Sequence, residues 1–184
     1  MARRCEYRFE KAQRGGAENW RRIAEKGICL GGFVPAGDTF WGDTKVVNHG
    51  DEFDDEDHPH RAVTAAIIGA AIKVQKALGP GLLEHAYNAC LAHALRLDGH
   101  KALQEVRLDI TYEGLCIPNA YIMDLVVDDK VIVEIKTVDR FSDAHFAQLN
   151  SYLRFSKLEL GLLLNFRIWP LRDGGIKRVI STHT

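Results

Sequence analysis

Residues 121–136 read Tyr-Ile-Met-Asp-Leu-Val-Val-Asp-Asp-Lys-Val-Ile-Val-Glu-Ile-Lys. The apolar runs on either side of a polar centre predict two strands joined by a short turn, which is a β-hairpin. Because side chains alternate along a strand, Glu134 and Lys136 are expected on the same face of the sheet. If the loop consists of residues 128–130 alone, Asp124 falls opposite Glu134. The sequence therefore predicts that two carboxylates and a lysine converge.

A cluster of this kind suits the hydrolysis of phosphodiester bonds. Carboxylate oxygens are hard ligands that hold Mg²⁺, and the metal lowers the pKa of a bound water while neutralising charge on the phosphate. Lys136 would steady the attacking hydroxide or the developing negative charge. The alternative is a surface ion pair at a strand end, which is the usual meaning of an isolated Glu-x-Lys. The apolar run 131–133 favours the functional interpretation, because Glu134 then emerges from a buried strand.

The segments after the hairpin predict one helix and two strands. Ser142 can cap a helix that runs to about Phe155, with its apolar residues facing inward. Residues 160–164 form a continuous apolar run, as expected of a strand that is covered on both faces. Residues 176–180 are expected to form a strand at the edge of the sheet.

The segments before the hairpin predict two helices and a strand. Apolar residues recur at helical spacing from Arg61 to Leu78, and a second helix follows Gly81 and runs to Asp98. Residues 106–112 alternate as a half-buried strand does. The resulting order, α-α-β-β-β-α-β-β, predicts an α/β fold with a mixed central sheet flanked by helices.

Residues 1–60 differ in composition from the rest of the chain. They combine a basic start, a Gly/Pro-rich middle and an acidic run at 51–57, without sustained apolar periodicity. We therefore expect 1–60 to be a disordered or weakly ordered extension, and 61–184 to be the folded domain.

The bulk properties set broad limits on the protein. At 184 residues with 46% hydrophobic residues, the chain can bury one ordinary core. It contains no apolar run long enough for a membrane span and no secretory signal, so a cytoplasmic protein without a membrane partner is expected. The net charge of −1 neither favours nor excludes nucleic acid as a partner.

A third carboxylate, Glu84, lies in the pattern formed by Gly81, Glu84 and Tyr87. With this pattern added to the Asp and the Glu-x-Lys of the hairpin, the sequence resembles the GxxExxY protein family, which is placed in the PD-(D/E)XK nuclease superfamily. The resemblance covers about residues 61–180. It continues, in order, through residues 124–127, 133–136, 148–153 and 161–166.

The resemblance implies a restriction-endonuclease-like core and a site for nucleic acid, with DNA as the expected substrate. It implies catalytic roles for Glu84, Asp124, Glu134, Lys136 and Gln148. The implied metal is Mg²⁺, with Mn²⁺ as a substitute, and its ligands would be Glu84, Asp124, Glu134 and the backbone carbonyl of Ile135. Without metal, the clustered acids should repel one another, so that at least one of them has a raised pKa.

Two alternatives remain open on the sequence. Ile122 stands where the resemblance leads us to expect Arg, which favours a nucleic-acid-binding module or interaction module that has kept the fold and lost turnover. The second alternative is RNA as the substrate, because an acid cluster contacts phosphate and does not read bases. His85 and His145 lie close to the predicted site along the chain, and no role is assigned to either.

Overall fold

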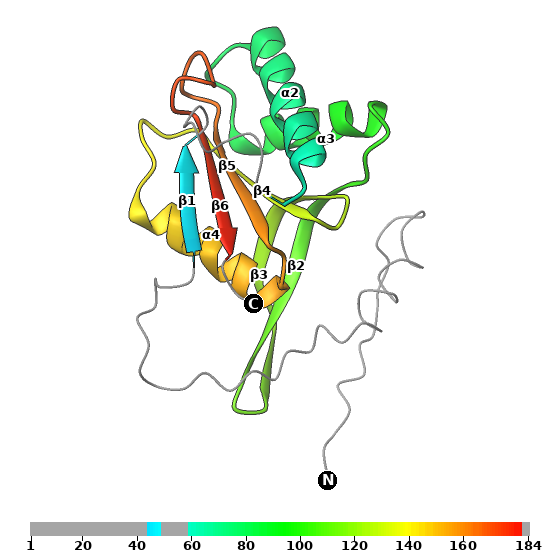
Figure 1. Ribbon diagram of the computed structural model, residues 1–184, viewed down its shortest axis with the longest axis vertical. Coiled ribbons are helices and arrows are strands. Elements are labelled where there is room, and N and C mark those ends of the chain that lie inside the picture. The colour runs from blue at the N-terminus through cyan, green and yellow to red at the C-terminus, as the bar shows by residue number, and fades with distance from the viewer. Residues whose placement is uncertain (1–43, 49–58, 182–184) are drawn as a thin grey trace.

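The computed structural model describes residues 44–48 and 59–181, which form three helices and one six-stranded sheet (Figure 1). The elements are β1 (Thr44–Asn48), α2 (Arg61–Leu78), α3 (Glu84–Leu97), β2 (Ala102–Tyr112), β3 (Leu115–Val127), β4 (Val131–Lys136), α4 (Asp143–Ser156), β5 (Leu160–Asn165) and β6 (Ile176–Ser181). The strand order is β1-β6-β5-β4-β3-β2, in which β4 and β5 are parallel and all other neighbours are antiparallel.

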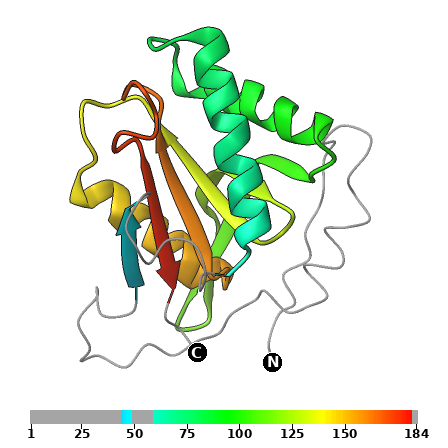
Figure 2. The ribbon, with the colours of Figure 1, turned by 45° about the horizontal axis from the view of Figure 1, so that its top comes forward.

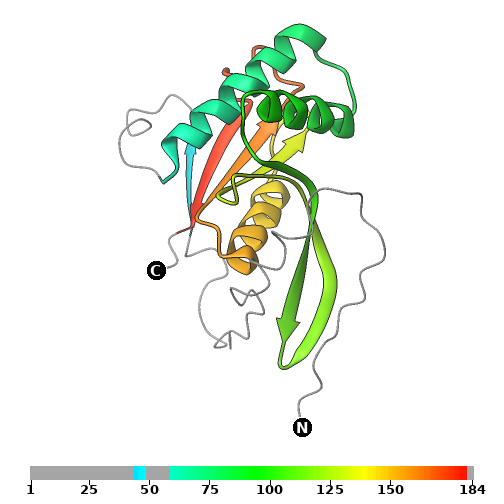
Figure 3. The same cartoon turned by 90° about the vertical axis from the view of Figure 1, so that its right-hand side faces the viewer.

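Helices cover both faces of the sheet. Helices α2 and α3 pack on one face and α4 packs on the other (Figures 2 and 3). Each face has its own apolar core, one built around Val133 and Leu162 and the other around Ile132 and Leu163. The predicted α/β fold with a mixed sheet flanked by helices is confirmed.

The three helices begin and end close to the predicted positions. In α2 the residues at helical spacing, such as Ile67 and Ala71, are fully buried, and the helix ends at Gly79, whose φ of +71° an L side chain rarely adopts. Leu149 of α4 is likewise fully buried against the sheet. No helix in the described part of the chain combines the length and apolar character needed to cross a membrane.

Strands β2 and β3 form a longer hairpin than the sequence predicts. Residues 102–105 and 115–120 extend the two predicted strands, and the arm projects away from the helices (Figure 3). The pairing register shifts between Leu108 and Ile110, where β3 bulges. Asn119, with a φ of +53°, lies in this bulge, and its N–H donates to Asp109 Oδ1 at 2.7 Å.

The structure corrects the prediction for the last strand. Strand β6 does not lie at the edge of the sheet, because β1 pairs with it antiparallel, with Val46 opposite Val179. These five residues belong to the segment predicted to be a disordered extension, and their β-branched Thr44, Val46 and Val47 suit a strand. Apart from β1 and residues 59 and 60, the predicted extension lies outside the described residues.

Candidate functional site

The hairpin of β3 and β4 places the predicted acids next to each other. Val127 pairs with Val131 and Leu125 with Val133, as a loop of residues 128–130 requires. The ladder ends there, one pair before the expected pairing of Asp124 with Glu134. Asp124 Oδ2 accepts a hydrogen bond from the N–H of Ile135 at 2.8 Å instead, so a side chain continues the connection between the strands.

Glu134 is buried deep in the site. Its side chain is 2% exposed, and its Oε1 accepts a hydrogen bond from Lys136 Nζ at 2.7 Å. Glu134 and Lys136 therefore share a face of the sheet, as strand alternation predicts. The other carboxylate oxygen, Oε2, is buried and has no hydrogen-bond partner among the described residues. A buried polar atom without a partner is costly, so this oxygen points to a ligand that the protein itself does not supply.

The acids influence each other electrostatically. Burial raises the pKa of Glu134 from 4.5 to about 7, with a further contribution from the negative charge of Asp124, while Lys136 opposes the rise. Burial also raises the pKa of Asp124, against the hydrogen bond from Ile135 and the charge of Lys136. The charge of Glu84 contributes to both increases. The expectation that at least one clustered acid has a raised pKa agrees with this pattern.

Glu84 joins the site from the first turn of α3. Its side chain is half-buried, and Oε1 accepts a hydrogen bond from the N–H of Thr137, the residue after β4, at 3.0 Å. This contact ties the helix to the end of the strand that carries Glu134. Both Glu84 and Asp124 thus use one oxygen on a backbone N–H and keep one oxygen for other partners.

The donor atoms can be tested against the metal that the resemblance implies. Across residues 44–48 and 59–181, no three side chains of His, Cys, Asp or Glu come together as a ready metal site. One carboxylate oxygen of Glu84 and one of Asp124 are already engaged by backbone N–H groups. Mg²⁺ usually binds only one or two protein carboxylates and keeps several waters. Glu134 Oε2 and the second oxygen of Asp124 fit such an ion as carboxylate donors.

Helix α4 brings three further side chains to this face. Gln148 Nε2 donates to the hydroxyl of Tyr152 at 2.6 Å, and that hydroxyl donates to the carbonyl of Ile122 at 3.2 Å. Burial raises the pKa of Tyr152, with a contribution from Glu134, so both Gln148 and Tyr152 lie near the acids. His145 Nδ1 accepts a hydrogen bond from the N–H of Ser142 at 3.1 Å, and burial followed by the charge of Lys136 lowers its pKa.

Two further residues of α3 have structural roles, and one of them, Asn88, supports the site directly. Asn88, buried four residues after Glu84, donates through Nδ2 to the carbonyl of Asp124 at 2.9 Å. Sequence reasoning did not identify Asn88, although a polar residue within the apolar face of a helix was the available signal. Tyr87 stacks on Phe166 with ring centroids 4.3 Å apart and donates to the carbonyl of Gly79 at 2.6 Å, which makes it a packing residue.

The comparisons with known proteins identify the family. A model described as the PD-(D/E)XK nuclease superfamily matches residues 61–179. The chain belongs to this superfamily. No curated protein and no solved structure matches the chain. In this PD-(D/E)XK protein, Asp124 lies within β3, the Glu134-Ile135-Lys136 run ends the neighbouring β4, and Glu84 is on the helix that packs beside both strands.

Proposed function

We propose that this PD-(D/E)XK protein is a Mg²⁺-dependent nuclease of the GxxExxY type that hydrolyses phosphodiester bonds of DNA. The observation that carries the proposal is Glu134 Oε2, a buried carboxylate oxygen without a hydrogen-bond partner among the described residues, with the half-buried acid Asp124 nearby. A purely structural ion pair with Lys136 would satisfy only Oε1 and would leave this desolvated oxygen unexplained.

Each residue of the site has a role in this proposal. Asp124, Glu134 and the Ile135 carbonyl would hold Mg²⁺, with Glu84 beside them. The bound ion would supply an activated water and neutralise charge on the phosphate. Lys136, fixed by Glu134 Oε1, keeps a positive charge beside the position where negative charge develops during hydrolysis. Gln148 acts with Tyr152 to support the α4 side of the site.

The proposal is tested by incubating the purified protein with single-stranded and double-stranded DNA and RNA, each with Mg²⁺, Mn²⁺, Ca²⁺ or EDTA. We expect cleavage of DNA with Mg²⁺ or Mn²⁺ and none with EDTA. Glu134→Gln should abolish it. Asp129→Asn is the matched control, because Asp129 lies in the loop of the same hairpin and pairs with Lys101 at 2.7 Å, outside the site. Cleavage that is equal in wild type and Glu134→Gln would contradict the proposal.

The second candidate function is a nucleic-acid-binding module without turnover. Ile122 favours it, because this apolar side chain is 52% exposed at the position where a phosphate-binding Arg is expected. The same assay separates the two functions, since the module would bind the oligonucleotides and leave them intact with every metal. Cleavage of RNA in place of DNA would make RNA the substrate and leave the proposed metal-dependent hydrolysis unchanged.

A further inference from the structure

A cleft separates the end of helix α2 from the loop between β5 and β6. Its volume is about 270 Å³, just under the roughly 300 Å³ at which sites for drug-sized ligands begin, so it has room for one small group. The lining combines apolar, aromatic and basic side chains and contains no acid. Its members include Ile72, Gln75, Lys76, Trp169, Leu171 and Arg172.

The cleft is held in shape by a buried side chain. Gln75 of α2 is 2% exposed, and its Nε2 donates to the carbonyls of Phe166 and Ile168 at 3.1 and 2.7 Å. Its Oε1 accepts from the N–H of Leu171 at 2.8 Å. Three hydrogen bonds from one side chain thus fix the loop to the helix, and a wall fixed in this way loses little freedom when a ligand binds.

Trp169 stands out on this wall. The indole is 53% exposed and stacks on no other ring of the described residues. Lys76 and Arg172 line the same cleft, are exposed, and form no ion pair within the described ranges. An exposed aromatic ring that shares a cleft with cations is typical of surfaces that bind single-stranded nucleic acid, in which bases stack on the ring and phosphates meet the charges.

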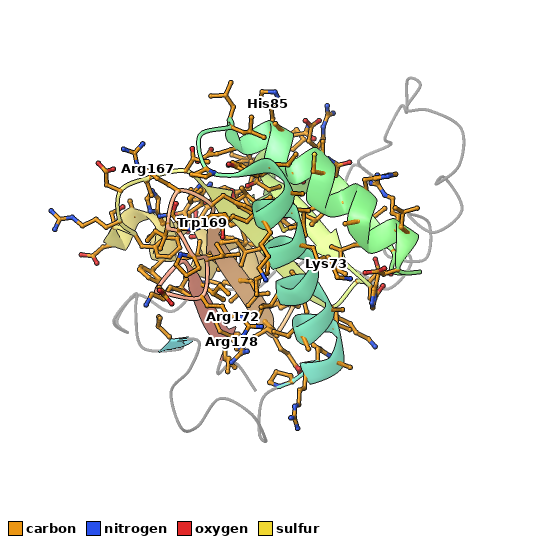
Figure 4. All side chains as sticks on the ribbon, turned by 90° about the horizontal axis from the view of Figure 1, so that it is seen from above. Lys73, His85, Arg167, Trp169, Arg172 and Arg178 are labelled. Atoms are coloured by element: carbon orange, nitrogen blue, oxygen red, sulfur yellow. The ribbon has the colours of Figure 1, made fainter. Side chains whose placement is uncertain are left out.

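The cleft and the catalytic site share one edge of the sheet. Strands β4 and β5 are parallel, so the segments after both strands leave at the same edge, where Lys136 pairs with Asn165. Arg167 and Asp139, one from each of these segments, pair at 2.6 Å. Figure 4 looks onto this edge, with Trp169 and Arg172 on one side of α2 and Lys73 on the other. The acids and the cleft therefore lie at the same edge of the sheet, with Glu134 on the α4 face and the cleft beside α2.

We propose that this cleft binds an unpaired base of the nucleic acid, a statement that rests on the proposed nuclease function. Trp169 stacks on the base, and Lys76 and Arg172 bind the adjoining phosphates. A base within a duplex is covered by its neighbours on both faces and cannot reach the indole. The preferred substrates are therefore single strands, overhangs or flaps rather than blunt duplexes.

The test measures binding of the full chain, in EDTA, to fluorescein-labelled oligo(dT), oligo(U) and a blunt DNA duplex by fluorescence anisotropy. Trp169→Ala should weaken binding to the single strands by about 5-fold to 150-fold, the range for one stacked base. Binding to the duplex should hardly change, and Trp169→Phe should retain most of the affinity. Tyr112→Ala is the matched control, because Tyr112 is 65% exposed at the tip of the β2–β3 hairpin.

The cations are tested by the salt dependence of the same binding. The double variant Lys76→Ala, Arg172→Ala should reduce the slope of log K against log salt by about 1.4, the value for two phosphates of a single strand. Lys73→Ala is the control, since Lys73 lies on the same helix and pairs with Asp98 at 3.6 Å. The oligo(dT) and oligo(U) arms show whether the base comes from DNA or RNA.

The outcomes separate this inference from the nuclease proposal. Unchanged binding of single strands by Trp169→Ala, equal losses on single strands and duplex, or no binding by the wild type would each overturn the inference. The nuclease proposal is decided separately, by comparing Mg²⁺-dependent cleavage by wild type and Glu134→Gln.

Discussion

The two faces of strand β4 are equally buried and chemically different. Toward α2 and α3 the strand presents only apolar side chains, Val131, Val133 and Ile135, each 0% exposed. Toward α4 it presents Ile132 and then Glu134, which is 2% exposed. Burial stabilises the apolar side chains on the first face, whereas on the second face it raises the pKa of Glu134 and so makes this carboxyl hard to ionise. Perturbed ionisation of this kind clusters at functional sites, which is why the proposed function is assigned to the second face.

The largest expected effect comes from the acidic face. Asp124→Asn should reduce Mg²⁺-dependent cleavage by more than about 100-fold, because loss of an outer partner of a metal ligand alone costs about 10-fold to 100-fold. The amide oxygen of the variant can still accept the Ile135 N–H, so the fold should persist. Cleavage rates and a thermal melt of the same preparation measure both. Full activity in this variant would remove Asp124 from the site.

The acidic face should also make stability depend on pH. Glu134 has a pKa of about 7 in the folded protein and the ordinary 4.5 when unfolded, so the folded state holds more protons between these values. The metal-free protein should therefore lose stability as pH rises from about 4.5 to 7, by up to about 3 kcal/mol at 1.36 kcal/mol per pKa unit. Urea unfolding across this range measures the slope.

Glu134→Gln should flatten that slope, whereas Glu159→Gln should not, because the Glu159 side chain is 62% exposed. Added Mg²⁺ should restore stability to the wild type above pH 7, since a bound cation favours the ionised acids. Parallel stability curves for wild type and Glu134→Gln would show that burial does not perturb Glu134.

A substitution on the apolar face should lower the free energy of unfolding and leave the rate of cleavage nearly unchanged. Val133→Ala removes two buried methyl groups and should cost about 1–3 kcal/mol, as lost transfer energy plus a cavity. Cleavage per folded molecule should stay within a few-fold of wild type. Val46→Ala is the control, because Val46 is 46% exposed and should cost less than about 0.5 kcal/mol. A large loss of cleavage by a fully folded Val133→Ala variant would show that the apolar face also affects catalysis.

The smallest effect is expected from a change that touches neither face of β4. A chain that begins at residue 58 lacks β1 and leaves β6 at the edge of the sheet. It should keep its cleavage and lose no more than about 5 °C in Tm, which corresponds to about 1 kcal/mol. A thermal melt followed by circular dichroism provides the measurement. Failure of this shortened chain to fold would show that residues 1–57 contribute more than one strand pair.

Much of the fold could be predicted because the apolar periods are regular from Arg61 onward. The pairing of β3 with β4 could be predicted from the three-residue loop between them. The loop length decides whether Asp124 and Glu134 lie on the same face of the sheet. The strand at 44–48 escaped prediction, because five residues within a glycine-rich and charged segment carry too little periodicity. The full length of the hairpin arm escaped for a similar reason, since Pro118 and Asn119 interrupt its pattern.

Only part of the site could be predicted from the sequence. Asp124, Glu134 and Lys136 could be placed by strand alternation and loop length, whereas Glu84 was proposed from the family resemblance. The N–H groups of Ile135 and Thr137 that hold Asp124 and Glu84 could not, because every residue except proline has such a group. The cleft beside Trp169 depends on the fold bringing α2 next to a loop about 90 residues later in the chain, and no local pattern encodes that contact.

The bulge in β3 makes the length of the hairpin arm adjustable during evolution. Ala102 pairs with Val127 and Leu108 with Tyr121, and beyond the bulge Ile110 pairs with Ile117. In the inner register Ile110 would face Asn119, so the bulge shifts the pairing by two residues of β3. Side chains beyond the bulge therefore keep the faces that they would have had without it. Residues could be gained or lost in matched pairs beyond Asn119 while Asp124 stays on its face. A single-residue insertion in the same place would reverse the outer arm, and we expect natural variants to avoid it.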